Sequence, residues 1–255
     1  MTDSTMRRDR LIRTDERSLS DVLGYILVFS LVLMSVLLVT VGGLATIEDA
    51  RDTEQAQNAE RAFEVVADNF AAIYERNAPS RATELDLGDS EIFYDSAVGI
   101  TVSTGDGREL VSRELTPVEM RIDDERRLVY EAGAVFRHSE AGVTMVREPP
   151  FMISEDRTHV PIIQTTSSTV ESAGSTTVLL RGVSTERSVA VPNEDFSQLR
   201  IEIASPRFEV WERHLSENTA LDCETDPVVD TVTCELDNPS SVHVTVQQID
   251  LSLIL

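Results

Sequence analysis

Histidine is the side chain best suited to acid–base chemistry near neutral pH, and this chain contains four of them. They are dispersed and follow no spacing typical of a metal site: His138, His159, His214 and His243. The sequence has no glycine-rich loop that would cradle phosphate groups and no Gly-x-Ser-x-Gly turn. Carboxylates are so frequent that no pair of them stands out. We therefore expect no catalytic residue, no metal ion and no cofactor.

The two cysteines, Cys223 and Cys234, lie near each other in an acidic segment rich in turn-forming residues. In a domain outside the cytoplasm, such a pair would form one local disulfide. Two free thiols are the alternative. Four carboxylates nearby could bind calcium: Asp222, Glu224, Asp226 and Asp230. A loop adapted to high salt explains them without a metal ion, and no Cys-x-x-Cys spacing indicates zinc.

The element that organises the rest of the chain is a long apolar stretch. No charged residue occurs from Val22 to Ile47, where leucine and valine predominate. At ~1.5 Å per residue, a helix of this length exceeds the ~30 Å hydrocarbon core of a bilayer. A helix buried at the edge of a soluble core would have a polar face, and this stretch has none. We therefore expect residues 19–47 to form a transmembrane helix in the lipid bilayer.

The charges on the two sides of this stretch predict its orientation. Five arginines precede it: Arg7, Arg8, Arg10, Arg13 and Arg17. Mainly acidic residues follow it, beginning at Glu48. Because arginine and lysine are enriched on the cytoplasmic side of membrane helices, the N-terminus is expected in the cytoplasm. The remaining chain would then lie outside the cell, as in a single-pass protein of the cell membrane.

The net charge is strongly negative, −23, with 45 acidic residues against 22 basic ones, all of them arginine. Such a charge opposes binding to nucleic acid. Dense carboxylates also keep a protein hydrated where salt screens their repulsion. We therefore expect a halophilic source, most simply a haloarchaeon, and no nucleic-acid partner.

A short sequence before the apolar stretch indicates proteolytic processing. Arg17-Ser18-Leu19 places a small residue after a charged one, and Ser20-Asp21-Val22-Leu23-Gly24 follows. Together they resemble the N-terminus of haloarchaeal archaellins and type IV pilins, although Asp21 stands where that pattern has proline. With residues 20–30 and 58–63 included, the chain resembles more closely a family of uncharacterised haloarchaeal pilin-like membrane proteins.

The resemblance implies that a prepilin-type peptidase removes residues 1–18 while the helix remains in the membrane. Ser20, Asp21 and Gly24 would then lie at the start of the mature helix. Asp21 would favour the first turn through the helix dipole, with Ser20 as a cap. Alternatively, its carboxylate would pair with the amino group of Leu19 in a neighbouring subunit. An anchor that keeps its leader is the alternative to processing.

Helical periodicity continues beyond the apolar stretch. Apolar residues recur at spacings of three and four from Ala59 to Tyr74, which describes one stripe on a helix. Pro79 disfavours helix just before itself, so the helix should end near Arg76. We therefore predict an extracytoplasmic stalk helix over residues 48–78, with its stripe packed on a domain.

Residues 79–255 have the pattern of short strands separated by turns, with hairpins at Gly105-Asp106-Gly107 and Asp123-Asp124-Glu125. Residues 165–177, rich in serine and threonine, predict a loop. Ser205-Pro206 predicts the start of a short helix that holds Trp211 as a partly buried anchor, with an exposed binding role as the alternative.

The last apolar segment, residues 241–255, predicts a strand paired inside a sheet, because a free apolar edge would aggregate. Its apolar residues change from one face to the other at Gln247-Gln248. The simplest explanation is a β-bulge at that point.

The predicted fold class is α+β: one long N-terminal transmembrane and stalk helix packed on an antiparallel β domain, as in pilins. The predicted function is a non-catalytic surface protein, a minor subunit of a type IV pilus-like filament. It would contact other pilin-like subunits through its transmembrane helix. The alternative is an anchored β domain that binds a ligand or the cell envelope without forming a filament.

Overall fold

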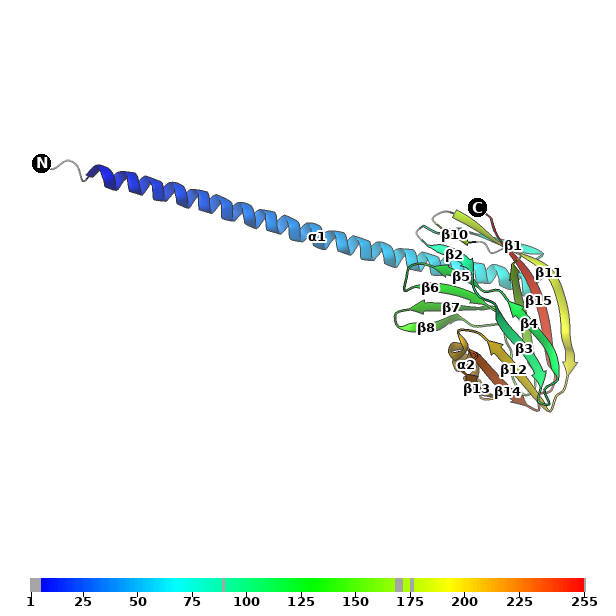
Figure 1. The fold of residues 1–255 in the computed structure, drawn as a ribbon. Helices are drawn as coiled ribbons and strands as arrows, with labels where there is room; N and C mark the ends of the chain where they lie inside the picture. The colour runs from blue at the N-terminus through cyan, green and yellow to red at the C-terminus, as the bar shows by residue number, and fades with distance from the viewer. Residues whose placement is uncertain (1–5, 89, 168–171, 175–176, 255) are drawn as a thin grey trace. The chain divides into compact units, whose positions relative to one another are not determined.

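The computed structural model describes residues 6–254 except 89, 168–171 and 175–176. Side chains are described for 22–40 and from Glu54 onward, apart from 89 and 168–176. The fold is α+β, with one N-terminal apolar helix and a mostly antiparallel β domain in sheets (Figure 1). The chain divides into two compact units, Met1–Glu54 and Gln55–Leu255.

Helix α1 runs from Met6 to Arg76 and contributes to both units. Its last turns follow the predicted stripe, with these side chains buried: Ala59, Phe63, Val66, Ala67, Phe70, Ile73 and Tyr74. The predicted end at Arg76 is also confirmed. Asn77 takes a left-handed backbone conformation, with a φ of 56°, and the Ala78 N–H donates to the Ala72 carbonyl at 3.1 Å. This geometry stops the helix and turns the chain into the first strand.

The strands of the second unit form three sheets (Figure 1). The four-stranded sheet has the order β1 (Ser80–Asp86), β11 (Thr177–Glu194), β15 (Val242–Ile254), β9 (Thr158–Ser167). The six-stranded sheet has the order β10 (Ser172–Gly174), β2 (Glu91–Tyr94), β5 (Val118–Arg121), β6 (Arg127–Glu131), β7 (Ala134–Ser139), β8 (Gly142–Arg147). The five-stranded sheet has the order β13 (Leu221–Asp226), β14 (Thr231–Asp237), β12 (Gln198–Ala204), β3 (Val98–Thr104), β4 (Glu109–Leu115).

Both predicted hairpins are confirmed, as the antiparallel pairs β3–β4 and β5–β6. The expectation of an antiparallel domain needs one correction, because β15 pairs with β9 in parallel. The expected loop over residues 165–177 is also wrong at its described positions. Thr165 to Ser167 complete β9, Ser172 to Gly174 form β10 against β2, and Thr177 begins β11.

The second helix, α2, spans Phe208–Ser216 and begins later than predicted. Arg207 occupies the N-cap position and makes no side-chain capping bond. The Ser205 hydroxyl instead accepts the Arg207 N–H at 3.1 Å, one turn before the helix. Trp211 of α2 is fully buried, more than the partly buried anchor that the sequence predicts.

The six-stranded sheet lies between two apolar cores. On one face, Leu128 and Tyr130 of β6 belong to the core that contains the α1 stripe. On the other face, Val129 belongs to the core that contains Trp211 of α2 and the inner face of the five-stranded sheet. Successive residues of β6 therefore enter different cores, as the alternation of a strand requires.

The same two cores explain the change of face in β15. Val242, Val244 and Val246 belong to the core around α2, whereas Ile249, Leu251 and Leu253 belong to the core around α1. The register of β15 against β9 is unbroken from Val242 to Leu251. β15 therefore carries no extra residue of its own at the predicted bulge, Gln247-Gln248. A register shift does lie opposite that point, in the partner strand β11 between Ser184 and Glu186, which pair with Ile249 and Gln248. Two further shifts in β11 lie at 189–191 and 192–194.

Candidate functional sites

The apolar segment of α1 is exposed along its whole described length. Residues Val22–Thr40, 19 in number, form a helix long and apolar enough to cross a membrane, and none of them is buried. A signal sequence has the same properties, so the segment fits both a transmembrane helix and a signal sequence. The hydroxyls of Ser35 and Thr40 donate to the carbonyls of Val32 and Val36, both at 2.8 Å. The helix thus satisfies these polar groups by itself, as lipid requires.

The predicted processing residues lie in the N-terminal part of α1. Its backbone is helical through Arg17, Ser18, Leu19 and Ser20, so in the full-length chain these residues do not begin a helix. Their side chains, and that of Asp21, lie outside the described part of the structure. Gly24 is described, and a Cβ atom there would meet nothing within 4 Å. The cleavage and the role of Asp21 therefore remain predictions.

Cys223 of β13 and Cys234 of β14 form a disulfide, with an S–S distance of 2.06 Å. The two residues are direct partners across the antiparallel pair, so the bond staples one hairpin. Of the four carboxylates near Cys223, Asp226 accepts the Val228 N–H of the hairpin turn at its Oδ1, at 2.9 Å. Within the described residues, no group of three histidine, cysteine or acidic side chains is placed to hold a metal ion.

The structure brings together two of the four dispersed histidines. His159 of β9 and His243 of β15 are register partners in the parallel pair, and their ring centroids are 5.2 Å apart. His159 Nε2 lies 3.2 Å from Thr245 Oγ1. The pKa of His159 is lowered by burial and, to a smaller extent, by the charges of His243 and Arg157. The sequence carries no signal for this pair, because β9 and β15 are distant along the chain and become neighbours only in the tertiary structure.

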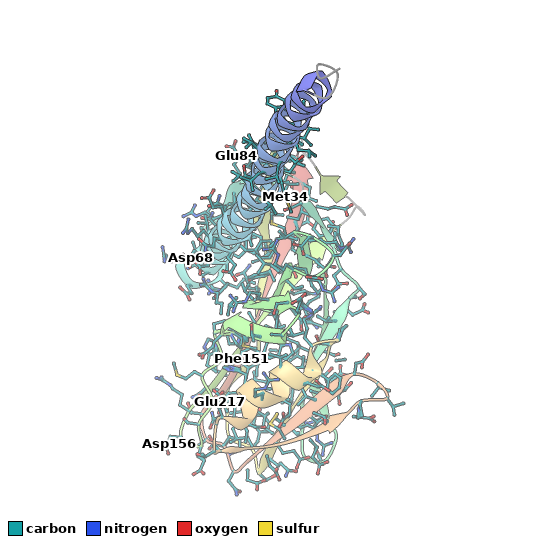
Figure 2. All side chains as sticks on the ribbon, turned by 90° about the vertical axis from the view of Figure 1, so that its left-hand side faces the viewer. Met34, Asp68, Glu84, Phe151, Asp156 and Glu217 are labelled. Atoms are coloured by element: carbon teal, nitrogen blue, oxygen red, sulfur yellow. A yellow bond between two sulfur atoms is a disulfide. The ribbon has the colours of Figure 1, made fainter. Side chains whose placement is uncertain are left out.

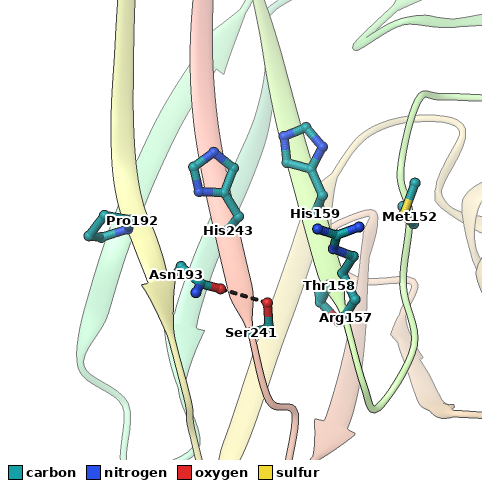
Figure 3. A pocket seen from close by; sticks show the side chains of 8 residues that line it. All are labelled: Met152, Arg157, Thr158, His159, Pro192, Asn193, Ser241 and His243. Carbon is teal, nitrogen blue, oxygen red and sulfur yellow. Dashed lines mark hydrogen bonds between the residues drawn. The ribbon is translucent and has the colours of Figure 1, made fainter.

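Two cavities share this histidine pair, with volumes of about 420 and 430 Å³. We call them together the histidine groove. The first contains Arg157, Asn193, Ser241 and Met152 in its wall (Figure 3). The second contains Tyr74, Glu75 and Arg187. Cavities of this size accept small organic molecules.

The other two histidines lie elsewhere. His214 of α2 lines a smaller cavity of about 260 Å³ with Phe151 and Glu217, both labelled in Figure 2. His138 of β7 is half-buried, and burial lowers its pKa to about 4, with smaller contributions from the charges of Arg127 and Arg207. Its imidazole is therefore uncharged at neutral pH.

A buried ion pair joins the six-stranded sheet to α2. Glu131, at 0 % exposure, accepts hydrogen bonds from Arg207 Nε at 2.6 Å and from Trp211 Nε1 at 2.7 Å. Arg207 also pairs with Asp95 at 3.1 Å. Every carboxylate oxygen of Glu131 thus has a partner, which offsets the cost of burying the charge. Because the carboxylate is closed off from solvent, we assign this group to the positioning of α2.

Glu119 of β5 lies on the same face of the six-stranded sheet as Glu131 of the neighbouring strand β6. The contacts of its carboxylate differ from those of Glu131. Its partners are more distant, with Arg127 at 3.7 Å and Arg121 at 3.8 Å. Oε1 accepts no hydrogen bond from the described residues. Burial raises the pKa of this carboxyl, against the lowering effect of the two arginines. The shift reflects burial and does not indicate a binding site.

Comparison with known proteins yields one match. A family model described as a family of unknown function (DUF7289) matches residues 17–252. The matched region includes both the apolar helix and the β domain. No curated protein matches the chain, and no solved structure matches it.

Proposed function

The chain belongs to the DUF7289 family, and we propose that it is a pilin-like, single-pass membrane protein with its β domain outside the cell. It serves as a minor subunit of a type IV pilus-like filament and is not catalytic. The observation that carries this proposal is the two-part character of α1. The segment Val22–Thr40 is apolar on every side, whereas the segment from Ala59 to Tyr74 buries a single stripe in the β domain.

The membrane location is supported by the full exposure of the apolar segment. Burial of a large apolar side chain is worth about 1.5–3 kcal/mol relative to water. A helix that offers such side chains on all sides therefore needs an apolar environment that the rest of the chain does not supply. Lipid provides it, and so do the apolar helices of neighbouring subunits.

The extracellular location of the β domain is supported by the disulfide between Cys223 and Cys234, because disulfides persist mainly outside the cytoplasm. The arginines that precede the apolar segment favour the same orientation.

Assembly would proceed through the apolar helices. Small residues allow membrane helices to approach closely, and the segment contains Gly24, Ser30 and Ser35. Removal of residues 1–18 by a prepilin-type peptidase would free the amino group of Leu19. A β domain of this size on every subunit favours a minor subunit over the bulk component.

The test is the N-terminus of the mature protein, measured by mass spectrometry on native membranes. We expect it to begin at Leu19. A bulky residue at the cleavage position, Ser18→Phe, should block processing and remove the protein from sheared filaments. The matched control Ser4→Phe should leave both unchanged. A mature chain that begins at Met1 or Thr2 contradicts the pilin-like assignment.

The histidine groove favours a second candidate, an anchored binding module that forms no filament. In that case the leader remains attached, and the protein stays in the membrane fraction when filaments are sheared off. Protease treatment of whole cells separates this candidate from a cytoplasmic domain, because only an external β domain is degraded.

A further inference from the structure

The wall of the first cavity of the histidine groove contains basic and uncharged side chains only, which is unusual in so acidic a chain. We propose that it binds the anionic group of a small organic ligand, a carboxylate or a phosphate, with Arg157, His159 and His243 as its cationic side. This inference is independent of filament assembly, because it concerns only the β domain.

The wall of this cavity contains no carboxylate. The chain has 45 acidic residues against 22 arginines, yet the wall contains one arginine, two histidines and no acidic side chain. The guanidinium of Arg157 forms no ion pair or hydrogen bond with a described side chain; the hydrogen bonds of this residue involve only its backbone, with Ser154. A guanidinium without a partner is suited to bidentate binding of carboxylate or phosphate.

Arg157 and the two histidines come together in this wall from two separate parts of the chain. Arg157 lies in the segment that precedes β9, and the two histidines lie on β9 and β15 (Figure 3). Pairing of the two strands fixes the imidazoles side by side, with centroids 5.2 Å apart. All three side chains therefore line one cavity, and the two histidines are held by a sheet rather than by loops.

The remaining wall is suited to an organic ligand. Ser241 Oγ lies 2.6 Å from Asn193 Oδ1, which orients the Asn193 amide group at the cavity. The carboxylates that follow Asn193, Glu194 and Asp195, do not line the cavity, and Asp195 accepts the Ser241 N–H at 3.0 Å. Met152, which is 55 % exposed, and Pro192 supply apolar surface.

Charge around the histidines predicts that binding depends on pH. His159 faces His243 on β15 and Arg157 before β9, and the second cavity adds Tyr74 and Glu75 of α1 and Arg187 of β11. Burial lowers the pKa of His159, and the charges of His243 and Arg157 lower it further. A bound anion would favour protonation of His159, so affinity should rise as pH falls through the pKa of His159. Glu75 lines the second cavity only, so no carboxylate lines the first.

The experiment uses the full-length protein in detergent micelles, titrated with sulfate or with acetate at constant chloride. Sulfate represents phosphate-type groups and keeps its charge between about pH 5.5 and 7.5, and acetate represents carboxylates and is mostly ionised over the same range. Binding is measured by calorimetry and by the NMR signals of the histidine rings. We expect saturable binding of at least one anion, tighter at the lower pH, with shifts of the His159 and His243 signals.

Variants locate the site. Arg157→Gln should weaken binding about tenfold, the usual effect of losing a charge-assisted contact. The double variant His159→Gln with His243→Gln should abolish the pH dependence. The matched controls Arg213→Gln and His214→Gln, on α2, should change affinity less than about twofold. Circular dichroism checks folding, and the exposed Arg157 keeps the test valid if the double variant does not fold. No saturable binding of either anion, or equal weakening in the controls, overturns the proposal.

Discussion

Helix α1 contains two apolar segments that differ in burial. From Val22 to Thr40 no side chain is buried, whereas from Ala59 to Tyr74 one stripe is buried in the β domain. The second segment alternates its stripe with exposed residues such as Glu64 and Asp68. The first has no such polar face. A helix with a polar face can bury its apolar stripe in the domain of the same chain. A helix that is apolar on every side cannot, so the polar face, rather than the apolar content, distinguishes the two segments.

The largest expected effect comes from giving the first segment charges. Leu31→Arg combined with Leu33→Arg should remove the protein from the integral membrane fraction after carbonate extraction. Each arginine near the centre of a membrane helix costs about 2.5–3.5 kcal/mol of insertion free energy.

The matched control places two arginines at exposed positions of the same helix, Gln57 just before the second segment and Glu64 within it. There the membrane fraction should not change, because those positions already face water. An unchanged membrane fraction for the Leu31→Arg, Leu33→Arg double variant would show that lipid does not surround this segment.

The next effect tests the buried stripe. Phe70→Ala should lower the free energy of unfolding by about 3–5 kcal/mol, since it leaves a cavity in the core. The Phe70 ring packs edge-on against Tyr130 of β6, with centroids 5.0 Å apart. Denaturant titration followed by fluorescence of the buried Trp211 measures the change.

Val65→Ala is the control on the same helix, because Val65 is 48 % exposed. Its effect should stay within about 0.5 kcal/mol. Neither variant should alter the membrane fraction. Equal losses at Phe70 and Val65 would mean that the stripe does not stabilise the domain.

The smallest effect is expected from the polar side of the second segment. Asp68 pairs with Arg147 of β8 at 2.6 Å, but its side chain is 72 % exposed (labelled in Figure 2). Asp68→Asn should lower the free energy of unfolding by no more than about 1 kcal/mol, and less at high salt. Glu64→Gln, at an exposed position without an ion pair to a described residue, provides the baseline. A loss above about 2 kcal/mol would show that charge, rather than the stripe, fixes the helix to the sheet.

The features that could be predicted from the sequence are those encoded by residues close together in the chain. The stripe of α1, the end of the helix before Pro79 and the two hairpins with acidic turns all depend on residues within one or two turns of each other. The cysteines are eleven positions apart, so their pairing could be anticipated, although free thiols stayed an alternative.

Contacts between distant residues explain what could not be predicted. The sequence by itself determined the apolar helix, its amphipathic continuation and the existence of a β domain, because each is encoded by a local period. Only the tertiary structure decided that β15 runs parallel to β9, which brings His159 to His243. It also decided that the two ends of β15 enter different cores, so that a change of face needs no extra residue in β15 itself. Which strands become neighbours depends on the packing of both cores at once, and no local pattern records it.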